Sequence, residues 1–214
     1  MTSEHPSTAQ ASRPPGRPRE FDVDEALDVL LELVWTRGYG ATSLLDMVEA
    51  TGLGKSSLRA AFGTKDEIMA AVLAHYAQRV IEPVIARVRD GDAGLADITR
   101  LFEALETVAR ARARAMGCAA TNLAVELGAR GEAVSRLHAQ LRARLRRAIV
   151  AALARAATLG EIAHEQLDAR AELLLTLFFG GAALTRAGAT PAERRLRMTA
   201  VTALLQSFRV TPRG

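Results

Sequence analysis

A short segment near the N-terminus concentrates side chains that bind phosphate. Lys55 and Lys65 are the only lysines among the 28 Lys and Arg residues of the chain. Ser56 and Ser57 directly follow Lys55, and Arg59 comes one helical turn later. Ammonium, guanidinium and hydroxyl groups bond phosphate oxygens, and from the first turn of a helix in the major groove they also reach base edges. The segment therefore predicts contact with DNA.

The residues around this cluster predict two short helices joined by a tight turn and followed by a third helix. Ser43 with Asp46 has the pattern of a capping box that opens the first helix, and a Thr-Gly pair closes it. Thr64 with Glu67 repeats the capping pattern, which places Lys65 at the first position of the next helix. The helix dipole disfavours a cation there, so a phosphate partner would account for Lys65.

The ordered series of residues from about position 17 to position 76 resembles the TetR family of bacterial transcription regulators. It includes Gly38-Tyr39, Thr42-Ser43, the Thr51-Gly52-Leu53 turn, and Phe62 with Lys65. The resemblance implies an all-α protein, with an N-terminal three-helix helix-turn-helix DNA-binding domain and a C-terminal helical domain for ligand binding and dimerisation. Trp35 matches a core aromatic of the family. Composition agrees, because aromatic residues make up only 4% and no stretch alternates apolar and polar residues.

The resemblance also divides the chain: residues 1–16 form a disordered tail, residues 17–77 the DNA-binding domain, and residues 78–210 the effector-binding and dimerisation domain. It assigns contact with a double-stranded DNA operator to a set of basic and hydroxyl residues: Arg17, Arg19, Thr42, Ser43, Lys55, Ser56, Ser57, Arg59 and Lys65. Two positions depart from the family pattern, because Arg59 replaces a usual tyrosine and Ala61 a common histidine or tyrosine. The operator sequence therefore cannot be transferred from relatives.

A second segment, from Gly117 to Glu126, resembles a Gly-Cys-x-x-x-Asn-x-Ala-x-Glu signature of one branch of the family, whose second domain forms a small-molecule pocket. The candidate residues of an effector pocket are Phe102, Met116, Cys118 and Asn122. Cys118 and Asn122 are four apart on one expected helix and could line the pocket together. A reactive Cys118 would sense electrophiles, with the arginines at positions 110, 112 and 114 favouring its thiolate. The alternative is a small, buried, inert side chain.

The last two expected helices predict self-association. Apolar residues between Leu173 and Leu184 cover almost every direction around one helix, so this helix must be buried on two sides. Thr190 and Glu193 form a capping box that opens the final helix. We expect both helices to pair with those of a second copy in a four-helix dimer interface. Its candidate residues are Leu175, Phe179, Ala183, Leu204 and Phe208.

Other classes of function find little support. The four histidines are scattered and no metal-ligand or phosphate-loop spacing appears, so we expect no enzyme, no metal and no cofactor. No apolar run is long enough for a membrane span, and the single cysteine excludes an internal disulfide, which favours a cytoplasmic protein. The sequence thus predicts a homodimeric regulator, by family analogy a repressor, that an unknown small-molecule effector releases from DNA. Two alternatives stay open: an electrophile- or redox-sensing regulator that uses Cys118, and an architectural DNA-binding protein without effector.

Overall fold

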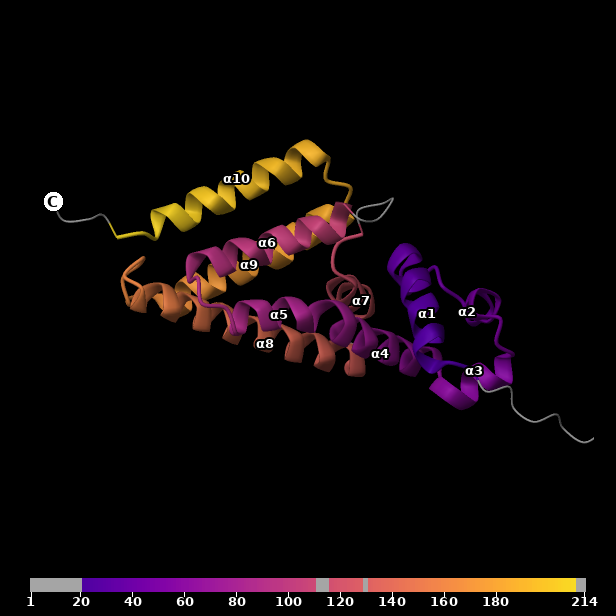
Figure 1. Ribbon diagram of the computed structural model, residues 1–214. Coiled ribbons are helices and arrows are strands. Elements are labelled where there is room, and N and C mark those ends of the chain that lie inside the picture. The colour runs from indigo at the N-terminus through magenta and orange to yellow at the C-terminus, as the bar shows by residue number, and fades with distance from the viewer. Residues whose placement is uncertain (1–20, 111–115, 129–130, 211–214) are drawn as a thin grey trace, which may run out of the picture.

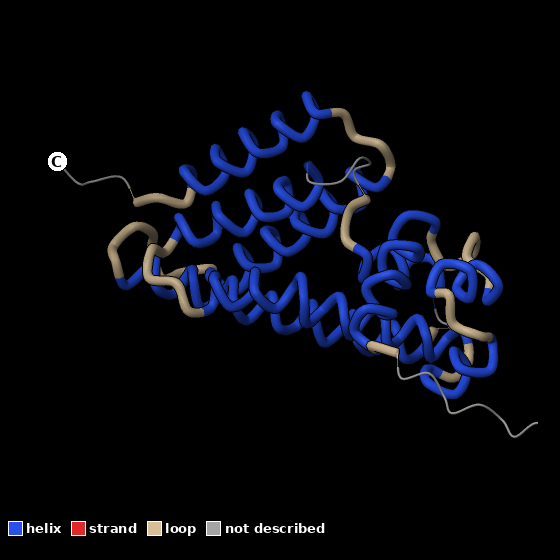
Figure 2. The backbone as a smooth tube through the Cα atoms, turned by 45° about the vertical axis from the view of Figure 1, so that its right-hand side comes forward, coloured by secondary structure: helices blue, strands red, loops and turns tan. Residues whose placement is uncertain are grey.

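The computed structural model describes residues 21–110, 116–128 and 131–210, and these residues confirm the all-α fold. The helices are α1 (Val23–Arg37), α2 (Leu44–Thr51), α3 (Lys55–Phe62), α4 (Lys65–Tyr76), the π-helical η1 (Ala77–Ile81), α5 (Glu82–Arg89), α6 (Leu95–Arg110), α7 (Ala119–Leu127), α8 (Glu132–Thr158), α9 (Leu167–Arg186) and α10 (Pro191–Ser207). The molecule is elongated, with α1 to α3 at one end and the C-terminal end of α10 at the other (Figure 1, Figure 2). Within these ranges, no helix combines the length and apolar character that crossing a membrane requires.

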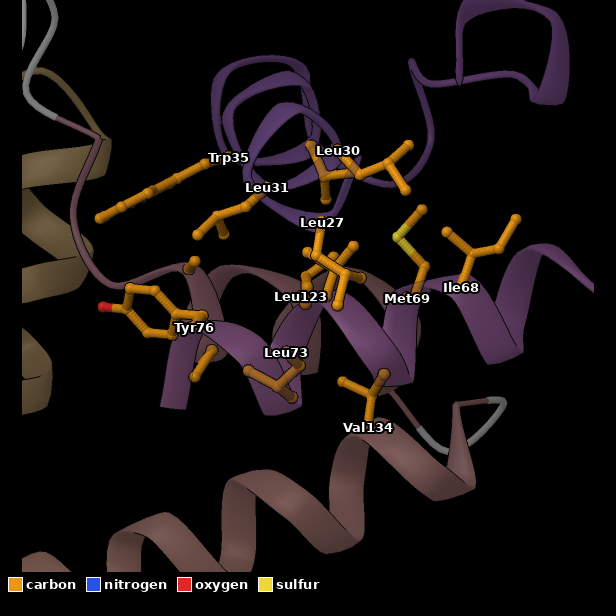
Figure 3. Packing of buried hydrophobic residues seen from close by; sticks show 14 of the residues in the cluster. Leu27, Leu30, Leu31, Trp35, Ile68, Met69, Leu73, Tyr76, Leu123 and Val134 are labelled. Atoms are coloured by element: carbon orange, nitrogen blue, oxygen red, sulfur yellow. The ribbon is translucent and has the colours of Figure 1, made fainter. Parts of the chain in front are cut away.

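The core of the DNA-binding helices includes residues from the C-terminal half of the chain. Leu30 and Trp35 on α1 and Leu73 on α4 belong to one buried cluster. Leu123 on α7 and Val134 on α8 belong to the same cluster (Figure 3). The two domains therefore share one continuous core across the boundary expected near residue 77.

Pro83 shapes the connection between the two domains. The sequence predicts that the helix opened by Thr64 ends or kinks near Ile81, and the structure shows a π-helical turn there. The N–H of Glu82 bonds the carbonyl of Ala77, five residues back. Proline has no N–H, and its ring would clash with a carbonyl four residues earlier in a regular α-helix, which accounts for the wider turn. As a result α4 continues into α5 without a loop.

A second core fills the C-terminal domain between α5, α6, α8, α9 and α10. The C-terminal half of α8 contributes an apolar stripe to it: Leu145, Ile149 and Leu153 are almost fully inaccessible to solvent. The helix is 27 residues long and packs against both neighbours in sequence, α7 and α9, as well as α4, α5 and α6. It is therefore the common support of both domains.

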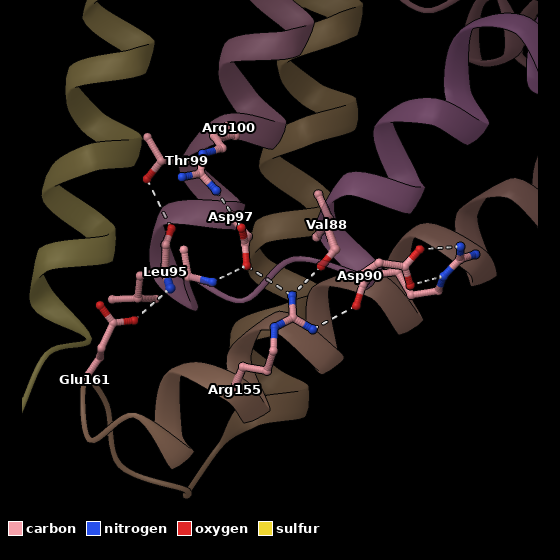
Figure 4. A network of polar contacts seen from close by, with 10 residues as sticks. Val88, Asp90, Leu95, Asp97, Thr99, Arg100, Arg155 and Glu161 are labelled. Atoms are coloured by element: carbon pink, nitrogen blue, oxygen red, sulfur yellow. Dashed lines mark hydrogen bonds and ion pairs between the residues drawn. The ribbon is translucent and has the colours of Figure 1, made fainter.

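A buried carboxylate ties α5, α6 and α8 together (Figure 4), at the end of these helices that lies away from α3 in Figure 1. The Asp97 side chain is 1% exposed and accepts hydrogen bonds from Arg100 at 2.8 Å, Arg155 at 3.2 Å and the N–H of Ala93 at 3.0 Å. Arg155 on α8 also donates to the carbonyl of Arg89 at 2.9 Å, near the end of α5. Asp97 thus holds the start of α6, and through Arg155 the end of α5, against α8.

We expect Asp97→Asn to lower the free energy of unfolding by about 3 kcal/mol, because it leaves the half-buried Arg155 without its anion. Urea denaturation monitored by circular dichroism measures the change. Glu132→Gln is the matched control, since Glu132 and Arg136 also lie 2.8 Å apart but are exposed. The control should shift stability by less than about 0.5 kcal/mol. Equal effects of the two substitutions would contradict this role of Asp97.

Candidate functional site

Ser43 and Asp46 open α2 with the capping box that the sequence predicts. The Ser43 hydroxyl accepts the N–H of Asp46, and the Asp46 carboxylate accepts the N–H of Ser43 at 2.7 Å. The hydrogen bonds from Ser43, with the nearby charge of Arg37 as a smaller contribution, lower the pKa of Asp46. The carboxylate therefore stays ionised at neutral pH, where it binds the positive end of the helix dipole.

The second helix of the motif, α3, presents its polar residues to solvent. It begins at Lys55, one residue past the turn, as predicted. Leu58 is fully buried and anchors the inner face of the helix. The opposite face is exposed and carries these side chains: Lys55, Ser56, Ser57, Arg59 and Ala61. A short helix with a cationic, hydroxyl-rich outer face fits the geometry needed in a major groove.

Thr42 requires a correction. The sequence assigns it to the DNA contacts, but its side chain is fully buried. Its hydroxyl donates to the carbonyl of Gly38, the residue that follows α1, at 2.7 Å. Thr42 therefore shapes the loop before α2, and its hydroxyl is not free for a phosphate. Arg17 and Arg19 lie outside the described residues, so their contacts stay predictions.

Lys65 has a second role that the sequence does not reveal. Its ammonium donates to the carbonyl of Tyr39 at 2.8 Å and lies 3.9 Å from the centre of the Tyr39 ring. The Tyr39 hydroxyl in turn donates to Asp66 at 2.7 Å. The capping box of Thr64 and Glu67 is present as predicted, and its hydrogen bonds lower the pKa of Glu67. Lys65 thus fixes the α1–α2 loop on the start of α4.

The end of α1 is bound by the C-terminal domain. The indole N–H of Trp35 lies 3.1 Å from the carbonyl of Gly117 and 3.3 Å from that of Met116. Arg186, the last residue of α9, donates to the Trp35 carbonyl at 2.9 Å. The Trp35 ring also meets the Tyr76 ring edge to face, with centroids 5.0 Å apart. Trp35 is a core residue, as predicted, and in addition it is the hydrogen-bonded link to the segment before α7.

Glu126 on α7 binds the loop that precedes α2. Its carboxylate accepts the N–H of Gly40 at 3.1 Å and lies against Gly38. Gly38 has a φ of +87°, a conformation that favours glycine, and a Cβ there would collide with the Glu126 carboxylate. We call the contacts that Trp35, Glu126 and Arg186 make between the two domains the domain joint.

The segment that resembles a pocket signature therefore contributes mainly to the domain joint. Gly117 provides a carbonyl for Trp35, and a Cβ at this glycine would meet the backbone of Ala182. The Asn122 amide donates to the Met116 carbonyl at 2.8 Å and so braces the same segment. The sequence indicates Glu126 only as the last residue of the pocket signature and does not predict its contact with the loop before α2. Nothing in the local sequence signalled Arg186, because its role depends on the docking of α9 beside α1.

The four candidate pocket residues do not share one wall. Cys118 is the residue before α7, not on the helix with Asn122, and it lines a cavity of about 20 Å³ between α5, α6, α8 and α9. Phe102 lines a separate cavity of about 280 Å³ between α6, α9 and α10. Met116 and Asn122 line neither cavity. We call the cavity of about 20 Å³ the Cys118 cavity. The Cys118 thiol is buried, and its sulfur accepts a hydrogen bond from the Tyr76 hydroxyl at 3.6 Å.

The residues predicted for the dimer interface differ in their exposure within one protomer, and their role in a dimer stays a prediction. Leu175 is buried within its own protomer, and Phe179 lines the Cys118 cavity instead of facing outward. Leu204 lines the larger cavity, and the half-buried Phe208 ring lies under the guanidinium of Arg170. Of the five, only Ala183 is exposed. The large apolar side chains exposed on α9 and α10 are Leu173, Leu177, Leu184 and Leu196, of which Leu173 and Leu177 also line the larger cavity.

Comparison with known proteins identifies relatives of this arrangement. Residues 26–72 match the family described as bacterial regulatory proteins, tetR family. The HTH-type transcriptional repressor ComR of Escherichia coli (strain K12) is 47% identical over 73 residues, which cover 34% of this chain and 35% of ComR. The HTH-type transcriptional repressor BdcR of the same organism is 33% identical over 112 residues, or 52% of this chain and 55% of BdcR. The chain thus matches about a third to a half of the length of these curated relatives.

A solved structure resembles nearly the whole chain. It is a cysteine mutant of the TetR family transcriptional regulator CifR complexed with 26 bp double-strand operator DNA. The TM-score is 0.75 at 26% sequence identity, and the match covers 90% of this chain and 100% of that chain. The arrangement of the helices, including the C-terminal domain, is therefore that of TetR-family structures.

The two lysines should differ in their effects on DNA binding. We expect Lys55→Ala to reduce the slope of log affinity against log salt by about 0.9, because one phosphate contact is lost, with an unchanged Tm. Lys65→Ala should lower the Tm as well, since it also releases Tyr39. Fluorescence anisotropy over a salt series, together with thermal unfolding, measures both. Arg136→Ala on α8 is the control, and a slope unchanged by Lys55→Ala would remove α3 from the DNA interface.

Proposed function

We propose that this chain, a TetR-family transcriptional regulator, is a repressor that binds operator DNA as a homodimer and leaves it when a small molecule fills the Cys118 cavity. The observation that carries the proposal is the exposed face of α3, which presents cationic and hydroxyl side chains. The fully buried Leu58 anchors the opposite face of the same helix. The named repressors ComR and BdcR, and the operator complex of CifR, support the same reading. A location beside the chromosome, in the cytoplasm, follows from it.

The contacts expected with the operator fall into two kinds. Lys55 and Arg59 are exposed cations suited to phosphate oxygens, while Ser56 and Ser57 occupy the first turn of α3 and suit base edges. Ser43 is exposed at the N-terminus of α2, and serine side chains are common phosphate contacts in DNA complexes. Affinity would then come mainly from the cations, and sequence preference from α3.

The domain joint couples the Cys118 cavity to α3, so an effector bound in the cavity can change the position of α3. Cys118 lines the cavity and directly follows Gly117, whose carbonyl holds Trp35. On the opposite wall Ile81 and Val84 lie where α4 continues through η1 into α5. A ligand that widens the cavity moves both walls, and both lead to the DNA-binding helices. The effector thus favours a dimer whose recognition helices are spaced wrongly for the major groove, which is a shift between two populations.

A reactive cysteine is the second candidate for sensing, and its position on the cavity wall favours it. Two features favour the non-covalent version. The thiol is buried, and apolar side chains such as Leu141 and Phe178 line the same cavity. Buried cysteines are shielded from reagents in solution. The side chains of the arginines at 110, 112 and 114 lie outside what the structure describes.

The dimer surface that we propose consists of the solvent-facing leucines of the last two helices. Leu173, Leu177 and Leu184 follow one face of α9, and Leu196 is 70% exposed on α10. Leucines placed together on two neighbouring helices mark an interaction surface more strongly than scattered ones. A twofold axis through this surface would bring α9 and α10 of two copies into a four-helix interface.

The function is tested by binding of the purified chain to DNA from upstream of its own gene. Because α3 is expected to read base edges, a site in this DNA should bind roughly 1,000-fold or more tightly than unrelated duplexes of equal length. Fluorescence anisotropy with competitor DNA measures the ratio. Equal affinity for unrelated duplexes would favour an architectural DNA-binding protein, and the absence of binding to any duplex would reject both.

Charge introduced on the dimer surface should separate the protomers. Leu177→Asp and Leu196→Asp each place a carboxylate in the proposed interface, where burial without a partner is costly. We expect both variants to sediment as monomers and to lose most of their operator affinity. Val125→Asp is the control, because Val125 on α7 is 77% exposed and is not part of the proposed surface. Dimers formed by both leucine variants would place the interface elsewhere.

A further inference from the structure

His138 places an unsatisfied nitrogen beside the Cys118 cavity. The Nε2 atom is buried and has no hydrogen-bond partner within the described part of the chain. His138 is one of the residues that line the cavity, and its ring meets that of Phe179 with centroids 5.5 Å apart. A buried polar atom without a partner costs free energy, so such groups in folded proteins call for an explanation. A ligand atom that enters the cavity would supply the missing hydrogen bond.

The rest of the wall is apolar. It is formed by aliphatic and aromatic side chains from six helical segments: Ile81, Val84, Ile85, Leu101, Ala120, Leu141, Leu145, Phe178 and Phe179. Cys118 completes the lining, and its sulfur already accepts a hydrogen bond from Tyr76. His138 is therefore the one lining side chain that offers a strong hydrogen-bonding atom without a protein partner.

The described lining residues are uncharged, and this restricts the charge of a ligand. Burial, and to a smaller extent the neighbouring Arg142, lower the pKa of His138, so the imidazole is neutral at pH 7. Among the residues that the structure describes, no carboxylate, ammonium or guanidinium group lines the cavity. An ionised ligand would lose its hydration without gaining a counter-ion, which is strongly unfavourable in an apolar site. A neutral imidazole nitrogen, in contrast, can pair with a hydroxyl or a carbonyl.

The size of the cavity shows that ligand binding requires movement. At about 20 Å³ it offers room for about one water molecule, whereas a benzene-sized guest needs on the order of 150 Å³. An open groove of about 670 Å³ runs between α5 and α6, and it shares Val84 and Leu101 with the cavity wall. These two side chains form the barrier between groove and cavity. A ligand entering there would separate α5 from α6, and α5 continues directly from α4.

We propose that the Cys118 cavity selects small uncharged ligands that carry one hydrogen-bonding oxygen on an apolar frame, and that His138 Nε2 binds that oxygen. Simple phenols and alcohols of similar size belong to this class. The groove at the entrance does not select charge, because it contains both cations and anions, including Arg87, Arg100, Asp90 and Glu103. The proposal rests on the proposed function in so far as it names the chemical class of the effector.

Four probes that each carry one substituent on a benzene ring test the proposal: phenol, toluene, benzoate and benzylammonium. The full-length protein is titrated with each, and binding is measured as a rise in Tm and by calorimetry. Phenol should bind roughly 5- to 10-fold more tightly than toluene, which has nearly the same shape, because of the hydrogen bond to His138. Benzoate and benzylammonium should bind at least tenfold more weakly than phenol, because their charges would be buried without partners.

Variants at position 138 test whether the His138 side chain causes the preference for phenol over toluene. His138→Phe keeps an aromatic ring against Phe179 but removes the nitrogen, so the advantage of phenol over toluene should disappear while toluene still binds. His138→Gln restores a hydrogen-bonding group and should restore the advantage. His164→Phe makes the same replacement at an exposed histidine and should leave all four affinities unchanged.

Three results would overturn the proposal: equal binding of phenol and toluene to the unmodified protein, an undiminished preference for phenol in His138→Phe, or no measurable binding of any probe. A protein with the predicted selectivity that fails to bind its upstream DNA would contradict the regulatory function alone. A protein that binds its operator but does not prefer phenol over toluene would contradict the ligand class alone. The two failures are therefore distinguishable.

Discussion

The hydrogen bonds between the Trp35 indole and the carbonyls of Met116 and Gly117 join the DNA-binding helices to the rest of the molecule. An indole N–H buried at the end of α1 needs an acceptor, and the segment before α7 provides two carbonyls for it. Docking of that segment also brings Leu123 into the core beneath α1 and α4. The orientation of α3 is therefore set by the C-terminal domain as well as by its own three-helix unit.

Gly117 connects this constraint to the ligand cavity. Its carbonyl binds Trp35, and the next residue, Cys118, lines the cavity. The backbone here has little freedom, because Gly117 has a φ of +63° and lies against Ala182 on α9. A shift of the cavity wall is thus not absorbed locally and passes to α1. The same argument holds on the opposite wall, where α5 and α4 form one continuous rod through η1.

The features that the sequence predicts correctly depend on local interactions. The capping boxes at Ser43, Thr64 and Thr190 form between residues three apart, and each starts a helix as expected. The exposed face of α3 follows from the single buried position at Leu58. Helix type and helix starts could therefore be predicted from neighbouring residues alone.

The errors concern which neighbour a side chain faces. The helix α9 is apolar on all sides, so its periodicity does not distinguish Phe179, which faces the cavity, from Leu177, which faces solvent. Cys118 leaves the helix expected around it because Gly117 adopts a positive φ. Thr42 finds its partner in the loop before α2. Each of these outcomes depends on tertiary packing, which a single sequence does not specify.

Trp35 is the only tryptophan in the chain, so its indole N–H gives a unique NMR signal at the domain joint. The most direct test of the account follows this signal during titration with operator DNA and, separately, with phenol. We expect both titrations to shift it, and phenol to weaken operator binding over the same concentration range. An indole signal that stays unchanged while phenol demonstrably occupies the Cys118 cavity would contradict coupling through the domain joint.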